Sequence, residues 1–248
     1  MPTLLSTVVS SGRVDGGNSL QIKLMVQTHS KYQDAINSLF TDARLKAFPK
    51  NQIISYQGDR LNEIYLIKEG YVKAYTILDT GDNRTLFLLG PGDIFPIAFS
   101  LTLNWDKYRL RYFYQSLTDA KIQILDHQTF KKSIDEDPAK ASVYLSYTSA
   151  SNEAIMNQLE VMKNKKAINK VEMLLPYLIS KLGEPIGHDR YRLRLRLSHQ
   201  EVADLSGVTR ETTTTLIKQL EKEGRLQQKR NTWIITHKPD DEDEHFIG

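Results

Sequence analysis

The feature that most constrains the fold lies in the C-terminal third of the chain, where the sequence predicts two short helices joined by a glycine turn. Ser198 and Glu201 form a capping box, in which the serine hydroxyl accepts from the Glu201 N–H and the glutamate reaches back to the Ser198 N–H. Residues 206–208 (Ser-Gly-Val) end this helix, and Thr209 is a favourable N-cap for a second helix that Gly224 stops. The pattern predicts a helix-turn-helix motif.

The second of these helices has an apolar face and a polar face. Its predicted buried positions are Thr213, Leu216, Ile217 and Leu220. Its predicted exposed positions are Arg210, Glu211, Thr214, Thr215 and Lys218. The four threonines 212–215 are poor helix formers, and a helix surrounded by solvent gains nothing from them. In a DNA major groove, threonine and arginine suit base edges and phosphates, and glutamate suits the cytosine amino group. This face therefore favours DNA recognition, and a helix-turn-helix used for protein contacts is the alternative.

Basic residues flank the motif on both sides. After it, residues 225–228 and 231–236 are predicted to form a two-stranded wing with Lys229 and Arg230 at its tip. Before it, residues 189–197 alternate arginine with tyrosine or leucine, which predicts a strand with one apolar and one arginine face. The arginine face suits phosphates, and a solvated edge strand is the alternative.

The charge balance differs between segments of the chain. Residues 1–162 have no net charge, residues 163–238 have a net charge of +8, and the last ten residues have a net charge of −5. A basic C-terminal third is typical of a protein that binds nucleic acid, and a solvated charged surface is the alternative. The acidic tail is expected either to compete with DNA for the basic face or to be a solvated terminus.

Short β-rich runs separated by glycine turns characterise the stretch from Ala47 to about Ile124. The predicted strands lie at residues 52–57, 63–68, 71–78 and 85–89. Their length and spacing favour a β-sandwich or a barrel-like roll. A short amphipathic helix is predicted over Tyr32–Leu45, and residues 1–30 show no sustained periodicity, which indicates a flexible extension.

A long helix is predicted to begin at Pro138, because proline is well tolerated at a first helical position. A series close to a heptad follows, comprising Tyr144, Thr148, Ser151, Ile155, Leu159 and Met162. A helix of this length spans about 40 Å at 1.5 Å per residue, which is longer than a small domain requires. The predicted dimer interface comprises Thr148, Ser151, Ile155, Leu159 and Met162. Packing of the helix on its own β-roll is the alternative. A further helix over Val171–Leu182 is expected to kink at Pro176.

Several classes of function are excluded or disfavoured by what the sequence lacks. The chain has no cysteine, which excludes disulfides, thiolate metal sites, cysteine-held iron–sulfur clusters and thiol nucleophiles. It has no Gly-rich phosphate loop, HExxH motif or GxSxG turn, so we expect no enzyme, and no metal or cofactor is predicted. No apolar run is long enough for a membrane helix and no signal peptide is recognisable, so we expect a cytoplasmic protein with no membrane contact.

Four stretches of the chain are similar to one known family. They are Ile53–Asp59, Ile64–Tyr75 (IYLIKEGYVKAY), Leu89–Phe95 (LGPGDIF) and Leu197–Gly224 (LSHQEVADLSGVTRETTTTLIKQLEKEG). On these motifs the chain resembles the cyclic-AMP receptor protein and fumarate–nitrate regulator (CRP/FNR) superfamily of bacterial transcription factors. The resemblance implies an α+β fold with an N-terminal cyclic-nucleotide-binding-like β-roll, a long dimerisation helix and a C-terminal winged helix-turn-helix. The expected segments are a flexible N-terminal extension (1–30), the β-roll sensor domain (31–137), the dimerisation helix (138–167), the DNA-binding domain (168–238) and the acidic tail (239–248).

The resemblance also implies partners and contacts. It implies a homodimer that binds a pseudo-palindromic operator in double-stranded DNA and contacts RNA polymerase. By position, it places phosphate contacts at Ser198, His199 and Gln200, and base contacts at Arg210, Glu211 and Thr215. The complete predicted DNA-binding set is Ser198, His199, Gln200, Thr209, Arg210, Glu211, Thr214, Thr215, Lys218, Lys229 and Arg230. Thr215 stands where the best-known members have an arginine that reads guanine, so we expect a different operator.

The predicted effector pocket departs from that of cyclic-AMP binders. Its candidate residues are Gly92, Asp93, Phe95, Arg109, Arg111, Ile155 and Met156. No glutamate follows the Gly-Asp turn to hold a ribose 2′-hydroxyl, and Arg109 and Arg111 flank the expected arginine position. We therefore expect a regulator that does not respond to cyclic AMP, with the effector unknown. The alternatives are a cyclic-nucleotide-responsive or haem-responsive regulator of the same fold, and a signalling or adaptor module without DNA binding.

Overall fold

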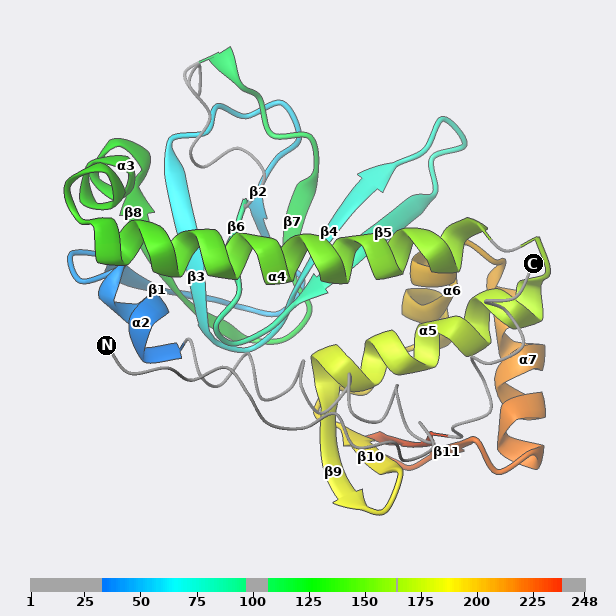
Figure 1. Ribbon diagram of the computed structural model, residues 1–248. Coiled ribbons are helices and arrows are strands. Elements are labelled where there is room, and N and C mark those ends of the chain that lie inside the picture. The colour runs from blue at the N-terminus through cyan, green and yellow to red at the C-terminus, as the bar shows by residue number, and fades with distance from the viewer. Residues whose placement is uncertain (1–32, 97–106, 164, 238–248) are drawn as a thin grey trace.

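The computed structural model describes residues 33–96, 107–163 and 165–237 (Figure 1). The N-terminal part is a β-roll and the C-terminal part is a winged helix-turn-helix. The long helix α4 (Pro138–Lys163) runs along both parts (Figure 1). The fold class is therefore α+β, as the sequence predicts. The predicted extension over residues 1–30 and the acidic tail over 239–248 lie outside the described residues.

Two four-stranded sheets form the β-roll. One has the strand order β1-β8-β3-β6, and the other has the order β2-β7-β4-β5. The strands are β1 (Arg44–Phe48), β2 (Ile53–Ser55), β3 (Glu63–Glu69), β4 (Val72–Ile77), β5 (Asn83–Leu89), β6 (Ile94–Phe95), β7 (Phe113–Ser116) and β8 (Ala120–Asp126). Aromatic rings fill the space between the sheets, because Phe95 of one sheet stacks on Tyr65 and on Tyr114, with ring centroids 4.8 Å apart in each pair. The inner faces of both sheets are thus joined by an apolar core.

The four predicted strands correspond to β2, β3, β4 and β5, and the glycine turns between them are confirmed. The predicted helix over Tyr32–Leu45 is wrong in its second half. Helix α2 (Gln33–Ser38) ends early, and Arg44–Phe48 forms β1 antiparallel to β8. Leu45 is 60% exposed, whereas Phe48 is buried. The apolar periodicity of the predicted helix ends at Phe40, and pairing with β8 sets the conformation of residues 44–48.

The N-terminal half of α4 packs on the β-roll. Asp137 caps the helix by accepting from the Ala139 N–H at 2.9 Å, and Pro138 is its first residue, as predicted. Tyr144 is buried against Phe130 of α3 (His127–Glu136), with ring centroids 5.3 Å apart. Tyr144, the first residue of the heptad-like series, therefore belongs to the β-roll core and lies outside the predicted dimer interface. The alternative of packing on the β-roll holds for this end of the helix.

The C-terminal part combines three helices with a four-stranded sheet of order β11-β12-β10-β9. Its elements are α5 (Ala167–Leu182), β9 (Gly183–Gly187), β10 (Arg190–Leu193), α6 (His199–Ser206), α7 (Arg210–Lys222), β11 (Leu226–Gln228) and β12 (Trp233–Thr236). Helix α5 begins four residues before the predicted Val171 and continues through Pro176 to its predicted end. Strand β10 ends at Leu193, so the predicted strand over 189–197 is too long, although Leu197 is still buried.

One apolar core extends from the β-roll into the C-terminal part. Tyr71, Leu88 and Leu117 of the β-roll belong to the same buried cluster as the inner faces of α5, α6 and α7. A buried hydrogen bond reinforces this contact, because the Leu88 N–H donates to the Tyr177 hydroxyl oxygen of α5 at 2.7 Å. Burial raises the pKa of the Tyr177 hydroxyl, so it stays neutral in this bond. The two parts are therefore packed against each other through their interiors.

Candidate nucleic-acid interface

The helix-turn-helix forms where the sequence predicts it. Ser198 and Glu201 make both bonds of the capping box, with the Glu201 N–H 3.2 Å from the serine Oγ and the Ser198 N–H 2.5 Å from the Glu201 Oε2. Gly207 ends α6 with a left-handed backbone (φ +68°) that suits glycine. Thr209 caps α7 by accepting from the Thr212 N–H at 3.3 Å. These local interactions define where α6 begins and ends and where α7 begins.

The polar face of α7 points into solvent. The side chains of Thr213, Ile217 and Leu220 are buried, and that of Leu216 packs against the same core. The exposed side chains of α7 include Arg210, Glu211, Thr215 and Lys218, and that of Thr214 is half-buried. The division into two faces predicted from the sequence is therefore confirmed.

Two hydroxyls of the threonine run are bonded inside the helix. Thr214 Oγ1 donates to the Arg210 carbonyl oxygen at 2.9 Å, and Thr215 Oγ1 donates to the Glu211 carbonyl oxygen at 3.2 Å. Because each hydroxyl has a single proton, it presents lone pairs and a methyl group to an incoming partner. Such a surface suits a base-edge amino group and a thymine methyl.

A cavity of about 320 Å³ opens at the N-terminus of α6. It is lined by Arg196, Leu197, Ser198, His199, Gln200, Arg210 and Gln228. The first N–H groups of a helix carry partial positive charge, and two arginines add full charges beside them. The charge and the position at a helix N-terminus suit a phosphate group of a nucleic-acid backbone.

The wing is a two-stranded hairpin of β11 and β12, as predicted. Its turn closes through a bond from the Lys229 N–H to the Thr232 carbonyl oxygen at 2.8 Å, and Lys229 and Arg230 are exposed at the tip. The Arg196 guanidinium donates to the Arg230 carbonyl oxygen and so ties the wing to the segment before α6. The wing therefore holds two cations beside the cavity.

The arginine face predicted over residues 189–197 does not form one continuous phosphate-binding stripe. All four arginines are exposed, and the alternating residues Tyr191, Leu193 and Leu197 are buried. Arg196 lines the cavity, whereas Arg194 lies beside Tyr71 of the β-roll. Burial raises the pKa of Tyr71, and the Arg194 guanidinium opposes that shift. The chain bends after β10, so Arg194 and Arg196 lie in different surroundings.

The structure brings together four predicted contact residues, Ser198, His199, Gln200 and Arg210, around the same cavity. Arg196 belongs to the predicted arginine face but not to the predicted DNA-binding set, and sequence reasoning did not single out Gln228. Arg196 is the last arginine of the alternating series, directly before the capping box, and Gln228 directly precedes the wing tip. Both residues are adjacent in the sequence to predicted contact residues, and this adjacency could have identified them.

The predicted dimer seam lies on α4. Thr148 and Ser151 are half-buried, and the side chains of Ile155, Leu159 and Met162 lie outside the described ones. Sequence reasoning missed Leu145, which is 67% exposed although it is apolar and lies on a helix. Its spacing of three residues from Thr148 places it at the start of a heptad series that omits Tyr144.

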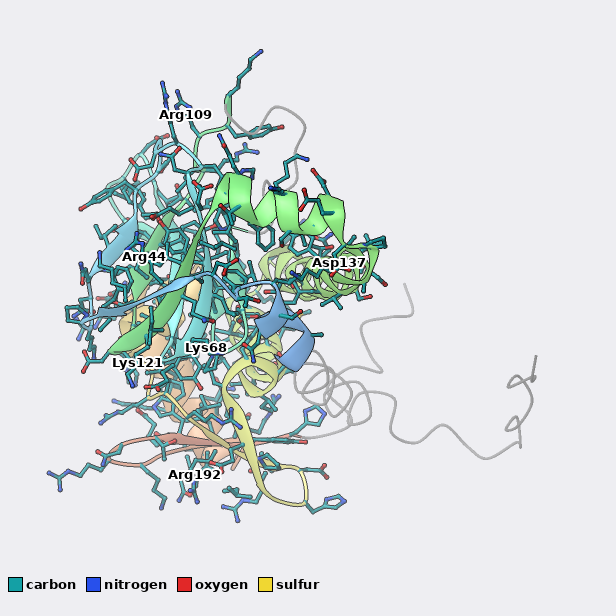
Figure 2. All side chains as sticks on the ribbon, turned by 90° about the vertical axis from the view of Figure 1, so that its left-hand side faces the viewer. Arg44, Lys68, Arg109, Lys121, Asp137 and Arg192 are labelled. Atoms are coloured by element: carbon teal, nitrogen blue, oxygen red, sulfur yellow. The ribbon has the colours of Figure 1, made fainter. Side chains whose placement is uncertain are left out.

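The residues predicted for the effector pocket separate into two groups. Gly92, Asp93 and Phe95 are buried, and Asp93 accepts from the Gly90 N–H at 2.7 Å while pairing with Lys181 of α5. Arg109 and Arg111, by contrast, are exposed. Figure 2 shows Arg109 at the end of the β-roll that lies farthest from Arg192 of β10. The side chains of Ile155 and Met156 lie outside the described ones.

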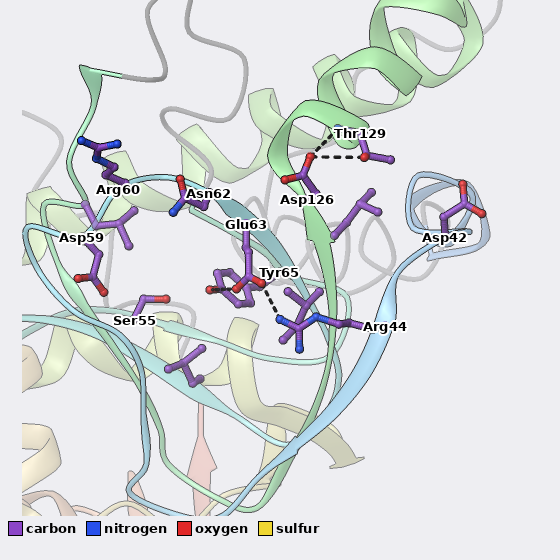
Figure 3. Close-up of a pocket in the computed structure, with 14 residues that line it drawn as sticks. Asp42, Arg44, Ser55, Asp59, Arg60, Asn62, Glu63, Tyr65, Asp126 and Thr129 are labelled. Atoms are coloured by element: carbon purple, nitrogen blue, oxygen red, sulfur yellow. Dashed lines mark hydrogen bonds and ion pairs between the residues drawn. The ribbon is translucent and has the colours of Figure 1, made fainter.

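A cavity of about 860 Å³ lies elsewhere in the β-roll (Figure 3). It is lined by residues of both sheets and of the loop before β3, and by none of the predicted effector residues. Within it Glu63 accepts from Arg44 at 2.5 Å and from the Tyr65 hydroxyl at 2.8 Å. Burial raises the pKa of Tyr65, so its hydroxyl remains a donor to Glu63. The polar groups at the centre of this cavity are thus bonded to one another.

The described residues contain neither a membrane-spanning helix nor a group of side chains that could hold a metal ion. In the parts of the chain with assigned structure, no helix combines the length and apolar character that a membrane crossing requires. Within residues 33–96, 107–163 and 165–237, no three His, Asp or Glu side chains are grouped to hold a metal ion.

Known proteins share the two parts of the structure, the β-roll and the winged helix-turn-helix. The family model described as "Cyclic nucleotide-binding domain" matches residues 45–137, and that described as "Crp-like helix-turn-helix domain" matches residues 173–241. The "Global nitrogen regulator" of Nostoc sp. is 25% identical over 224 residues, which cover 87% of this chain and 96% of the relative. The "Regulatory protein CysR" of Synechococcus elongatus is 28% identical, covering 71% of this chain and 77% of the relative.

A solved structure has the same fold. The structure of FixK2 from Bradyrhizobium japonicum superposes with a TM-score of 0.67 at 19% identity, over 79% of this chain and 93% of that one. The two family models match the β-roll and the winged helix-turn-helix in the order seen here. The chain therefore belongs to the CRP/FNR superfamily of transcription regulators, with a cyclic nucleotide-binding-like domain followed by a Crp-like helix-turn-helix domain.

Proposed function

We propose that this protein is a homodimeric, sequence-specific DNA-binding regulator that does not respond to cyclic AMP. In this proposal α7 enters the major groove, and the N-terminus of α6 and the wing tip contact the phosphates on either side. It acts in the cytoplasm, contacts RNA polymerase and catalyses no reaction. The observation that carries the proposal is the surface formed by the exposed face of α7, the cavity beside it and the wing.

Charge and shape both support DNA as the partner. Arg196 and Arg210 line the cavity at the α6 N-terminus, and Lys229 and Arg230 stand at the wing tip. A recognition helix flanked by two phosphate-binding elements is oriented on the duplex before any base is read. The base-reading residues would then be Arg210, Glu211 and Thr215, with Thr209, Thr214 and Lys218 at the edge of the groove.

The exposed side of α4 supports the homodimer. Leu145 and Thr148 lie one helical turn apart, and positions 155, 159 and 162 continue the same spacing in the sequence. A second copy of this helix would cover Leu145, which water otherwise contacts. Two recognition helices joined in this way would read half-sites about 34 Å apart on one face of the duplex.

The insensitivity to cyclic AMP is supported by the placement of the candidate effector residues. Asp93 forms an ion pair with Lys181, and Phe95 is stacked between two tyrosines. Arg109 and Arg111 are exposed. None of the five described candidates lines the 860 Å³ cavity in the β-roll. Addition of cyclic AMP is therefore expected to leave DNA affinity unchanged.

The test starts from the purified full chain without added effector. Selection from random double-stranded DNA is expected to enrich a two-fold symmetric sequence. Fluorescence anisotropy of the enriched duplex across a salt series is expected to show a steep loss of affinity with salt, because phosphate contacts release counterions. Sedimentation of the complex should give two chains per duplex. Absence of enrichment, together with salt-insensitive binding, would refute DNA reading and favour an adaptor module.

A further inference from the structure

The C-terminal sheet has one covered face and one open face. The apolar side chains of β10 and β12 are buried in the core that contains α5. Because side chains alternate across a strand, Arg190 and Arg192 of β10 lie on the opposite face, together with their register partners Thr236 and Ile234 of β12. Figure 2 shows Arg192 pointing away from the β-roll. This open side, with its two exposed arginines, is called the outer sheet face below.

The charge of the outer sheet face is positive. Glu184 of β9 lies opposite Arg192 in the register, but both side chains are exposed. In the described part of the chain no ion pair joins Arg190 or Arg192 to a carboxylate. The nearby Asp189 carboxylate contacts His188 Nδ1 at 2.6 Å instead. Two cations therefore face solvent here with one carboxylate beside them.

The chain leaves the sheet beside these arginines. Thr236, the last residue of β12, is the register partner of Arg190, and the next residue, His237, donates its N–H to the Asp189 carbonyl oxygen at 2.7 Å. The sequence then continues into five consecutive carboxylates at positions 240–244, which lie outside the described residues. The most acidic segment of the chain thus follows directly on the strand that borders Arg190.

The length of chain between the sheet and the carboxylates permits contact. Position 240 is four residues from Thr236, a length that spans at most about 14 Å, and position 244 is eight residues away, at most about 28 Å. Arg192 lies about 7 Å from Arg190 along β10. The carboxylates are therefore within reach of both arginines. Surface ion pairs are weak one by one, but a short tether holds the carboxylates at a millimolar effective concentration.

We propose that residues 240–244 bind the outer sheet face through ion pairs with Arg190 and Arg192 and thereby compete with DNA. The competition rests on the proposed DNA-binding function. Arg196, which lines the cavity at the start of α6, is four residues from Arg192 and so at most about 14 Å away. Because the Debye length is about 10 Å at 0.1 M salt, bound carboxylates repel a phosphate that approaches this cavity. DNA must therefore displace the acidic segment.

The first experiment tests the contact in the free, full-length protein. Because the chain has no cysteine, Ile247→Cys gives a single attachment site for a nitroxide spin label. The label broadens the backbone amide signals of nearby residues in 1H–15N spectra. The matched control has the same label and the same chain length but amides in place of the five carboxylates: Asp240→Asn, Asp241→Asn, Glu242→Gln, Asp243→Asn and Glu244→Gln.

At about 50 mM salt, the signals of Arg190 and Arg192 are expected to be broadened more strongly in the chain with carboxylates than in the control with amides. At about 500 mM salt the two chains should give equal broadening, because salt screens exposed ion pairs. Equal broadening at the lower salt concentration overturns the proposal. Extra broadening centred on Lys229 and Arg230 would place the contact at the wing tip and overturn the assignment to the outer sheet face.

The second experiment measures competition by fluorescence anisotropy of a labelled duplex at about 50 mM salt. Replacing the five carboxylates by amides is expected to lower Kd about tenfold, as the loss of two surface ion pairs predicts. In a chain with Arg190→Gln and Arg192→Gln, the same replacement should change Kd less than about twofold. The control background, Lys50→Gln with Arg60→Gln, removes two exposed cations of the β-roll and should keep the tenfold effect.

The outcomes separate this proposal from the proposed function. An equal gain in all three backgrounds would show general repulsion of DNA by the acidic segment and overturn the proposal. Unchanged Kd on replacing the carboxylates, despite contact in the spectra, would overturn the competition. Contact in the spectra of a protein that binds no DNA in any variant would leave the contact standing and refute the proposed function.

Discussion

The ammonium of Lys181, near the end of α5, lies 3.4 Å from both carboxylate oxygens of Asp93, in the turn that leads into β6. The Asp93 side chain is 3% exposed and that of Lys181 is 18% exposed, so water screens this pair only weakly. The pair connects the β-roll to the DNA-binding part at the turn where the family resemblance placed an effector. In this protein the turn therefore contacts α5 directly.

Lys181→Met is expected to lower the free energy of unfolding by about 3 kcal/mol, because it leaves the Asp93 charge buried without its ammonium partner. Urea unfolding followed by circular dichroism measures this difference. The double variant Lys181→Met, Asp93→Asn is expected to recover most of the loss, since the buried charge is then absent. A loss below about 0.5 kcal/mol in the single variant would show that the pair contributes no more than a surface pair.

Asp204→Asn is expected to stabilise the protein at pH 7. Burial raises the pKa of the Asp204 carboxyl, although its bond from Gln200 and the nearby Lys73 and Arg84 oppose the shift. A raised pKa means that the folded state binds the proton more tightly, so the wild-type carboxylate costs stability once the pH exceeds the folded pKa. The advantage of Asn should therefore shrink as the pH falls toward about 4, the unfolded value. Thermal melts from pH 4 to pH 7 measure it, with the exposed Asp79→Asn as control.

Gly207→Ala is expected to lower the free energy of unfolding by about 1–2 kcal/mol, because φ is +68° at this position. A Cβ there would also lie 1.5 Å from Arg84 Nη1, but that group is the far end of a flexible side chain and can move. The loss should therefore persist in an Arg84→Ala background. If it disappears there, the clash and not the backbone conformation is the cause.

Glu211→Ala is expected to relax sequence preference at one base pair by roughly 1–3 kcal/mol, whereas Lys229→Ala should weaken all sequences alike. Glu211 lies on the exposed face of α7, and Lys229 lies at the wing tip, for which we propose a phosphate contact. Anisotropy with the selected duplex, single-base variants of it and random duplex separates the two effects. Equal losses on specific and random DNA for both variants would contradict this division.

Leu145→Glu is expected to convert a dimer to monomers, because it places a charge where a second α4 would bury an apolar side chain. Sedimentation velocity at micromolar concentration measures the state. Ser146→Glu, one position away from the heptad series and also exposed, is the matched control and should remain dimeric. A dimer in both variants would place the interface elsewhere.

The helix-turn-helix could be predicted from the sequence because its signals are local. The cap at Ser198, the left-handed Gly207 and the cap at Thr209 each act within four residues, and all three are found as expected. The two faces of α7 follow from helical spacing alone.

What could not be predicted depends on contacts between distant segments. Residues 44 and 45 are predicted to end a helix, but they form a strand by pairing with β8, about 75 residues later in the chain. Tyr144 fits the heptad-like series by spacing, and its burial against Phe130 depends on the position of α3. Asp93 pairs with Lys181, and Gln228 contacts His199. No spacing along the chain connects the two residues of either pair.

The core that Tyr71, Leu88 and Leu117 share with α5 and α6 has a consequence for how the molecule unfolds. Because these side chains pack in one cluster with the C-terminal helices, melting of either part is expected to expose apolar surface of the other. A fragment that begins at Ala167 would therefore lose stability and solubility, even though the helix-turn-helix model matches it as a separate domain. The β-roll and the winged helix-turn-helix are therefore expected to unfold in one cooperative transition.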